Sequence, residues 1–280
     1  MHQVELTDDE YARFCGLIYR TAGIRIAENK RVMVGNRVRR RLRATGIETF
    51  AEYFAYLTSP AGAGEMPDFV DAITTNETYF FRDIHHYRWL GGEFLPEMAR
   101  RATTPGGAGR TPRRIRIWSA ACSTGEEAYS IAIEVFSRRT ILAGWDIRIL
   151  GPDISGQALA AARAGRYDAR AVRLVEPARR AAFFDEDSNA GRWVVKPDLR
   201  ALVEWRAHNL LRPITGGPFD CTFIKNVLIY FDRDSKKVVV RNLVEAMAPG
   251  GYLVVGPTEG VFDMLDGLER VQSWLYRKPG

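Results

Sequence analysis

From residue 115 onward, short apolar runs alternate with stretches of helical periodicity, and this alternation constrains the fold more than any other feature. Buried strands are expected at about 115–118, 147–150, 202–207, 221–224 and 252–255. Helices are expected among them at about 125–138, 155–164 and 233–247. Strands that alternate with helices form a largely parallel sheet covered on both faces. The pattern therefore predicts an α/β domain whose ligands bind at the carboxyl ends of the strands.

One segment, at about 165–202, interrupts this alternation. It contains Phe183 and Phe184, then a polar stretch over 185–191, and then Arg192–Lys196, which reads as a short strand. We expect this segment to form a small inserted β-subdomain. Another stretch, Thr103–Arg114, is rich in Gly, Pro and Arg and predicts a flexible surface loop.

The first hundred residues read as helical. Thr7 and Glu10 suit a capping box at the start of the first helix, and Gly23 suits its end. Further helices are expected at about 29–44, at about 49–58 and from about 68 toward 74. We therefore predict a small all-α N-terminal domain over residues 1–73, followed by the α/β domain over residues 74–280.

The composition indicates a cytoplasmic protein. Cys15, Cys122 and Cys221 are far apart and odd in number, which argues against a disulfide framework and a zinc site. No apolar run approaches the roughly 20 residues that span a bilayer. The first residues, Met1–Glu5, are polar and lack the pattern of a signal peptide. We expect neither a metal site nor membrane insertion.

The second expected helix is strongly basic. Seven of the fourteen residues from Lys30 to Arg43 are Lys or Arg, whereas the whole chain has a net charge of only +6. Such a patch attracts nucleic acid, a membrane surface or an acidic protein, and a solvated charged face is the alternative. Charge alone does not choose among these partners, although no nucleic-acid-binding motif accompanies the patch.

Small residues follow the first expected strand, in the stretch Trp118–Glu127. They let a ligand approach the backbone at the start of the next helix, but the dinucleotide pattern G-x-G-x-x-G is missing. Glu126 and Glu127 would not suit a pyrophosphate, and they favour a ligand with positive charge such as S-adenosylmethionine. Alternatively, the two acids only complement the dipole of the helix N-terminus.

Polar or aromatic residues follow three other expected strands. Asp153 could accept hydrogen bonds from ribose hydroxyls, or serve as an acid at a helix N-terminus. Asn209 and Leu210 could contact an adenine ring, although a turn asparagine explains Asn209 equally well. Tyr230 could hydrogen-bond a substrate, or belong to the core. These positions all lie where the fold is expected to bind a ligand.

The stretch Thr74–Asp83 mixes polar and aromatic residues too closely for a clean amphipathic helix. It could fold over a site, with Arg82 available to a carboxylate, or it could begin a helix capped by Thr75 or Asn76. The patterns H-E-x-x-H, C-x-x-C, G-x-S-x-G and G-K-[ST] do not occur. Metalloprotease, hydrolase and P-loop functions therefore have no support.

Together, five ordered segments resemble the chemotaxis receptor methyltransferase family (CheR-type). They are residues 75–83, 118–127, 153–155 (Asp-Ile-Ser), 209–211 (Asn-Leu-Leu) and 225–231 (Lys-Asn-Val-Leu-Ile-Tyr-Phe). The resemblance covers nearly the whole chain and implies a Rossmann-like methyltransferase domain with an inserted β-subdomain after a helical domain. It also implies methyl transfer from S-adenosyl-L-methionine to glutamates of methyl-accepting chemotaxis receptors, with S-adenosyl-L-homocysteine as product.

By this resemblance, the cofactor-binding residues would be Asn76, Thr78, Arg82, Glu126, Asp153, Asn209, Leu210, Lys225 and Asn226. Glu126 would bind the methionine part, Asp153 the ribose, and Asn209 with Leu210 the adenosine. Arg82 and Tyr230 would act where the methyl group is transferred. The basic helix would dock on the receptor's helical bundle through Arg37, Arg40 and Arg41, with no nucleic acid involved.

Three positions depart from the family pattern. Lys225 stands where the family usually has Arg, Pro152 replaces a small polar residue, and Gly256–Glu259 replaces a Gly-x-Ser-Glu run. A glutamate nucleophile is ionised at neutral pH, with a reference pKa of about 4.3, so direct attack on the methyl carbon needs no general base. A methyltransferase for another substrate, or a cofactor-binding module without turnover, are the alternatives.

Overall fold

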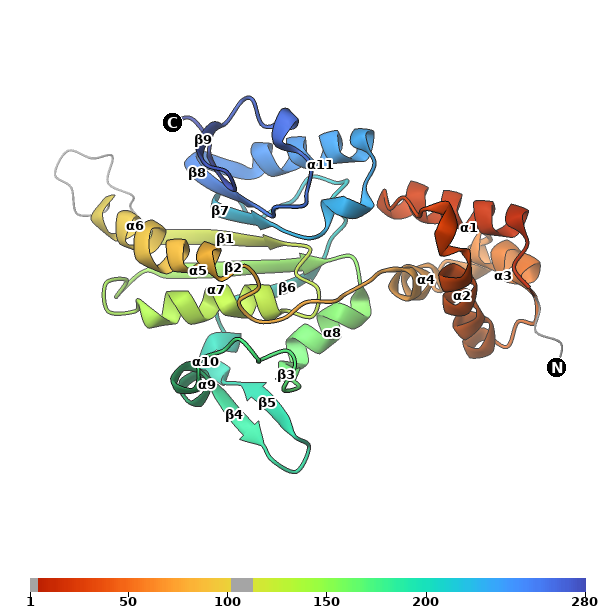
Figure 1. Ribbon diagram of the computed structural model, residues 1–280, viewed down its shortest axis with the longest axis horizontal. Helices are drawn as coiled ribbons and strands as arrows, with labels where there is room; N and C mark the ends of the chain where they lie inside the picture. The colour runs from red at the N-terminus through yellow and green to blue at the C-terminus, as the bar shows by residue number, and fades with distance from the viewer. Residues whose placement is uncertain (1–4, 102–112) are drawn as a thin grey trace.

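The computed structural model describes residues 5–101 and 113–280, and it confirms the predicted fold class. Figure 1 shows an all-α part at the N-terminus, a central sheet flanked by helices, and a small sheet that projects from it. The first four residues, on which the signal-peptide argument depends, lie outside the described ranges. So does most of the loop expected at Thr103–Arg114. No described helix is long and apolar enough to cross a membrane.

Four helices build the N-terminal domain, and their ends follow the local sequence signals. The helices are α1 (Asp8–Ala22), α2 (Arg31–Thr45), α3 (Phe50–Leu57) and α4 (Met66–Ile73). Thr7 and Glu10 form the predicted capping box of α1, and Thr49 and Glu52 form a second one at α3. Short 3₁₀ turns at Glu28–Lys30 and Pro60–Gly62 precede α2 and follow α3.

A buried network of charged groups ties three of these helices together. The Arg41 guanidinium donates to both carboxylate oxygens of Glu65 at 2.8 Å and to Asp68 at 2.8 Å. The Tyr53 hydroxyl donates to Glu65 at 2.7 Å, and Glu65 is only 8% exposed. Because Arg41 lies on α2, Tyr53 on α3 and Asp68 on α4, the network fixes how these helices pack.

The central sheet has seven strands in the order β6-β2-β1-β7-β8-β10-β9. The strands are β1 (Arg114–Ala120), β2 (Asp146–Asp153), β6 (Val203–Ala207), β7 (Phe219–Ile224), β8 (Met247–Val255), β9 (Glu269–Gln272) and β10 (Leu275–Arg277). The five strands predicted from the sequence are parallel, whereas β10 and β9 form an antiparallel hairpin at one edge. The sheet is therefore mixed, and the hairpin is an element that the sequence analysis missed.

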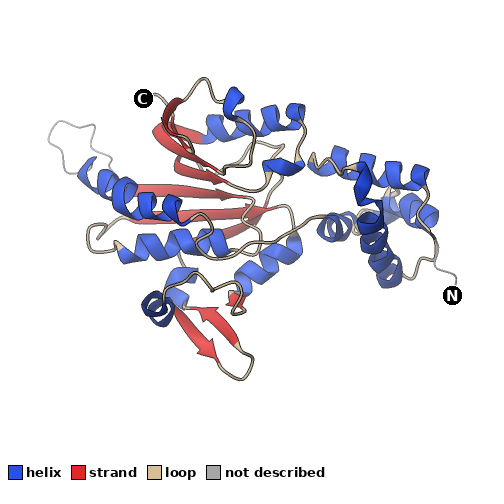
Figure 2. Ribbon diagram, in the orientation of Figure 1, coloured by secondary structure: helices blue, strands red, loops and turns tan. Residues whose placement is uncertain are grey.

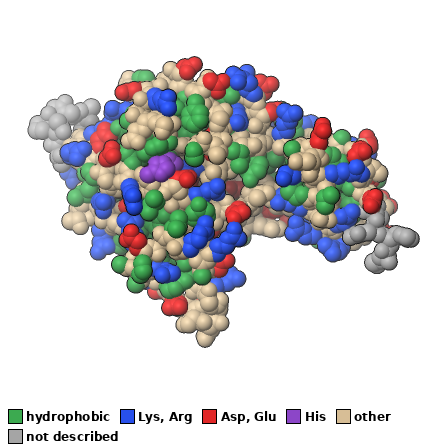
Figure 3. Space-filling view, in the orientation of Figure 1, with side chains coloured by type: hydrophobic (Ala, Val, Ile, Leu, Met, Phe, Trp, Pro, Cys, Tyr) green, Lys and Arg blue, Asp and Glu red, His purple; other side chains and the backbone are tan. Residues whose placement is uncertain are grey.

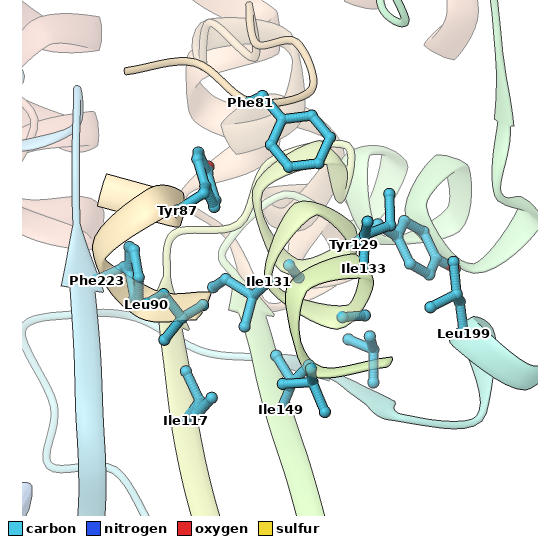
Figure 4. Close-up of a cluster of buried hydrophobic side chains, with 14 of the residues drawn as sticks. Phe81, Tyr87, Leu90, Ile117, Tyr129, Ile131, Ile133, Ile149, Leu199 and Phe223 are labelled. Carbon is cyan, nitrogen blue, oxygen red and sulfur yellow. The ribbon is translucent and has the colours of Figure 1, made fainter. Parts of the chain in front are cut away.

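Successive residues of these strands pack against opposite faces of the sheet. Ile117, Ile149 and Phe223 belong to the core shared with α5 (Ile84–Trp89), α6 (Leu95–Arg101) and α7 (Glu126–Ser137), as Figure 4 shows for α5 and α7. Trp118 and Leu150, one residue further along their strands, pack in a second cluster with α11 (Arg233–Ala246). The helices α5 and α6 lie at the end of the region that reads as helical, but their bounds and the π-helical turn that joins them at Leu90–Phe94 were not predicted.

The segment after α8 (Gly156–Ala164) forms the expected β-subdomain (Figure 2). Its three antiparallel strands have the order β3-β5-β4. Its elements are β3 (Arg166–Tyr167), α9 (Pro177–Phe183), β4 (Phe184–Asp187), β5 (Arg192–Val195) and α10 (Pro197–Arg200). The subdomain leaves the central sheet after β2 and returns to it at β6, so its insertion does not disturb the parallel strand order.

We expect Glu65→Gln to lower the free energy of unfolding by about 2–4 kcal/mol, because it removes one partner of a buried ion pair. Burial raises the pKa of Glu65, but hydrogen bonds from Arg41 and Tyr53 outweigh burial, so the pKa lies below its ordinary value. This stabilisation is therefore present above the unfolded-state pKa of about 4.3 and is lost as the pH falls below it.

Urea unfolding between about pH 7 and about pH 3 measures both effects. The exposed Glu48 supplies the matched control, Glu48→Gln, which should unfold like the unchanged protein. Equal stability of the two variants near neutral pH would contradict the prediction.

Candidate active site

A cavity of about 510 Å³ lies between the helical domain and the carboxyl ends of the parallel strands. Its walls come from residues 22–33 of the helical domain, from residues 73–82, and from the segments that follow β1, β2, β6 and β7. Figure 3 shows a hollow between the two domains, with Lys and Arg side chains on both sides. The volume lies within the range of about 300–1,000 Å³ that is usual for small-molecule sites.

Most residues predicted to bind the cofactor or act on the substrate line this cavity. They are Asn76, Thr78, Arg82, Asp153, Asn209, Leu210, Lys225, Asn226 and Tyr230. Glu126 is not among the described lining residues: it is 4% exposed and accepts a hydrogen bond from the Thr124 hydroxyl at 2.6 Å. Burial raises the pKa of Glu126, and the hydrogen bond from Thr124 opposes this rise.

Lys225 occupies the centre of a buried polar network beneath the cavity. Its side chain is 2% exposed, and its ammonium lies 3.4 Å from Asp83 Oδ2 and 3.5 Å from Glu127 Oε2. The ammonium also donates to the Arg82 carbonyl at 2.7 Å and lies 5.2 Å from the centroid of the Tyr87 ring. A compact ammonium with three donors suits these partners, so the network does not need the planar fork of an arginine.

Backbone strain is concentrated around the cavity. Among the described non-glycine residues, positive φ angles occur at Phe81, Asp83, Ala121, Ser123 and Asn226, all between 53° and 60°. The last three line the cavity, and the first two flank Arg82. Such conformations cost about 1–3 kcal/mol each and persist only where the surroundings over-determine them. The backbone is thus held in an unfavourable form where a ligand would contact it.

The turn that carries Arg82 is held from two sides of the structure. Phe81 is 2% exposed, and its N–H donates to the Ser130 hydroxyl on α7 at 3.0 Å. On the other side, Lys225 binds both the Arg82 carbonyl and the Asp83 carboxylate. These contacts fix the backbone of Arg82 at the cavity wall.

Asp153 has the geometry for contact with a diol. Its two carboxylate oxygens accept hydrogen bonds from the backbone N–H groups of Ser123 at 2.7 Å and Ser155 at 2.9 Å. Burial raises the pKa of Asp153, while these hydrogen bonds oppose the rise. Each carboxylate oxygen can accept a further hydrogen bond, so the two interpretations of Asp153, helix-start acid and ligand acceptor, are compatible.

The two lining asparagines have partners that build the cavity wall. The Asn209 amide donates to the Thr21 carbonyl at 2.7 Å and accepts from the Leu211 N–H at 3.0 Å. The Asn76 amide lies 3.3 Å from the Ser155 hydroxyl. Asn209 therefore joins α1 to the end of β6 while its neighbour Leu210 also lines the cavity.

A buried carboxylate shapes the loop that carries Asn226 and Tyr230. Glu259 is fully buried and accepts hydrogen bonds from the N–H groups of Asn226, of Val227 at 3.2 Å and of Leu228 at 2.7 Å. The departure from the family pattern at residues 256–259 thus keeps the glutamate that organises this loop.

Several lining residues were missed by the sequence analysis. Ile24 forms an antiparallel bridge with Phe231, and the Arg25 N–H donates to the Tyr230 carbonyl at 2.8 Å. Lys30 and His208 also line the cavity. Burial and Arg206 lower the pKa of His208, so its imidazole is neutral near pH 7. No local pattern in residues 24–30 indicates these contacts, because their partners are about 200 residues away in the chain.

The basic residues predicted to bind a receptor fall into two groups. Arg37 donates to the carbonyls of Ile73 and Thr74 and to the Thr75 hydroxyl, and Arg41 belongs to the Glu65 network. Arg40 is exposed on α2. Arg37 and Arg41 therefore have intramolecular partners, whereas the Arg40 side chain faces solvent.

Comparison with known proteins gives a consistent family assignment. The family model described as "CheR methyltransferase, SAM binding domain" matches residues 76–276, and "CheR methyltransferase, all-alpha domain" matches residues 9–74. A "Chemotaxis protein methyltransferase 1" of Pseudomonas aeruginosa is 38% identical over 271 residues, which cover 94% of each chain. The "Chemotaxis protein methyltransferase" of Salmonella typhimurium is 35% identical over 268 residues, covering 94% of this chain and 88% of its own.

The two family models meet between residues 74 and 76, directly after the end of α4, so the all-alpha model matches the helical domain and the SAM-binding model matches the α/β domain. The chain therefore belongs to the CheR methyltransferase family and is an S-adenosylmethionine-dependent chemotaxis protein methyltransferase.

Proposed function

We propose that this protein transfers the methyl group of S-adenosyl-L-methionine to glutamate side chains of chemotaxis receptors, forming methyl esters. The observation that carries this proposal is the cavity, which is lined by polar residues of both domains, among them Arg82, whose guanidinium could bind a carboxylate. Relatives at 35–38% identity carry the name chemotaxis protein methyltransferase. We place this reaction in the cytoplasm, as the composition suggests.

The lining residues fit the chemical groups of the cofactor. Asp153 would accept the ribose hydroxyls, and Leu210 would pack against the adenine beside Asn209. Asn76, Thr78 and Asn226 offer hydrogen-bonding groups to the amino-acid end. The Glu126 carboxylate accepts a hydrogen bond from the Thr124 hydroxyl, and its contact with the methionine part of the cofactor stays a prediction. When bound, S-adenosylmethionine supplies an electrophilic methyl group on a positively charged sulfur.

The remaining chemistry is positioning. A glutamate carboxylate is ionised near pH 7, so no residue of this chain has to remove a proton. Arg82 would orient that carboxylate through a charge-assisted hydrogen bond, and the Tyr230 hydroxyl would hold it from the other side. The helical domain would keep water from the reacting groups by closing one side of the cavity.

Receptor recognition is proposed to use the basic helix α2. The methylated region of such receptors is a helical bundle with acidic residues, and α2 offers complementary charge at Arg40 and its neighbours. Arg37 and Arg41 would contribute to the positive field while keeping their intramolecular bonds. Neither nucleic acid nor membrane insertion has a part in this proposal.

The direct test is incubation with methyl-labelled S-adenosylmethionine and a cytoplasmic receptor fragment, followed by measurement of base-labile methyl ester. We expect label on receptor glutamates, and none on a fragment whose candidate glutamates are changed to alanine. Tight cofactor binding without any label would favour another substrate or a cofactor-binding module without turnover.

We expect Arg82→Ala to lower kcat at least about tenfold, which corresponds to about 1.4 kcal/mol of lost transition-state stabilisation. The reason is that the carboxylate loses its orienting partner. Arg82→Lys keeps the charge and should recover part of the loss. Single-turnover methylation of the receptor fragment measures both variants, and unchanged turnover in Arg82→Ala would remove Arg82 from the mechanism.

We expect Arg40→Glu to raise the KM for the receptor fragment by about three- to tenfold, because it replaces attraction with repulsion at the docking face. The dissociation constant of S-adenosylmethionine should not change. Arg139→Glu is the matched control, since Arg139 is exposed just beyond the C-terminal end of α7, away from the cavity. Equal KM values for the two variants would indicate that α2 is only a solvated helix.

A further inference from the structure

The segment that precedes Arg82 is fastened to the inserted subdomain. The Phe80 N–H donates to the Ala171 carbonyl at 3.0 Å, and Glu77 forms an ion pair with Arg170. The Phe80 ring makes edge contacts with the rings of Tyr167 at 4.8 Å and Phe184 at 5.1 Å. Residues 77–80 are therefore held in place by contacts with the inserted subdomain.

Tyr79 lies within this segment and contacts two guanidinium groups. The Arg173 guanidinium of the subdomain lies 3.6 Å from the centroid of the Tyr79 ring. The Arg82 guanidinium lies 5.7 Å from the same centroid. One aromatic ring therefore attracts a cation of the subdomain and the cation that faces the cavity.

The guanidinium of Arg82 is held by fewer contacts than its backbone. Its backbone is fixed by Lys225, but its guanidinium makes a long hydrogen bond of 3.4 Å to the Glu77 carbonyl in addition to the ring contact. A long arginine side chain loses much rotamer freedom when it is held in one position. Contact with a ring that is already packed against Arg173 lowers this loss, because the ring itself is held in place.

We infer that Tyr79, held by Arg173, is a positioning residue that aims the Arg82 guanidinium at the substrate carboxylate. The inference rests on the proposed role of Arg82. It assigns to the inserted subdomain a part in turnover, through the contact between Arg173 and the ring. A cation held over an aromatic face needs the ring and not the phenolic hydroxyl, so phenylalanine should replace Tyr79 and an aliphatic residue should not.

The test compares Tyr79→Leu with Tyr79→Phe in the methylation assay. We expect Tyr79→Leu to lower kcat about fivefold, with the KM for S-adenosylmethionine unchanged, because only the orientation of the carboxylate is affected. Tyr79→Phe should stay within about twofold of the unchanged protein, and Arg173→Gln should lose about two- to threefold. Arg139→Gln is the matched control, since Arg139 stacks 4.7 Å from the Phe136 ring away from the cavity.

Two results would overturn the inference. One is an equal loss in Tyr79→Leu and Tyr79→Phe, which would mean that the ring face does not matter. The other is an additive loss in the double variant Tyr79→Leu with Arg82→Ala, since a residue that acts through Arg82 has no effect once Arg82 is gone. Thermal unfolding of each variant confirms that a loss of kcat does not come from unfolding.

The activities of Arg82→Ala and Tyr79→Leu together distinguish a failure of the proposed role of Arg82 from a failure of the inference on Tyr79. If Arg82→Ala kept full turnover, the role of Arg82 and the inference would both fall. If Arg82→Ala lost activity while Tyr79→Leu did not, Arg82 would keep its role and only the inference on Tyr79 would be overturned.

Discussion

The site depends on one buried cation. Lys225 is nearly inaccessible, and it compensates two carboxylates, Asp83 and Glu127, that come from segments on either side of it. Burying a charge is costly unless it is paired and hydrogen-bonded, so these groups stabilise the structure only together. By also holding the Arg82 carbonyl, the ammonium connects the end of β7 to the turn that presents Arg82.

The helical domain is a structural part of the cavity. Asn209 bonds to the end of α1, Ile24 pairs with Phe231, and the Tyr19 hydroxyl donates to Asp232 at 2.7 Å. A further contact joins the Asp71 carboxylate at the end of α4 to the Gln157 N–H at the start of α8. The helix α2, whose Met33 lines the cavity, belongs to the domain that these contacts hold in place.

Local patterns predicted the parallel strands and most helices because each depends on its own residues. The helix α1 begins at a capping box of Thr7 and Glu10 and ends at Gly23. The apolar run at Cys221–Ile224 indicates a buried strand. The bounds of α5 and α6 were not predicted, because Leu90–Phe94 forms a π-helical turn with two glycines, which breaks the usual helical spacing. The hairpin of β9 and β10 was missed because β9 is exposed and lacks an apolar alternation.

In the candidate site, too, some features follow from local sequence and others depend on the folded chain. Local sequence patterns predict which polar residues follow each strand, since Asp153, Asn209 and Lys225 come after apolar runs whose ends meet at one edge of the sheet. The folded chain determines which residues line the cavity: it buries Glu126, which bonds to Thr124, and it brings Arg25 and Lys30 from the helical domain to the wall. It also decided that Arg37 and Arg41 bond within the chain and that Tyr79 lies between Arg173 and Arg82. Strand formation and helix capping depend on neighbouring residues, whereas strand order, burial and long-range pairing depend on residues far apart in the chain.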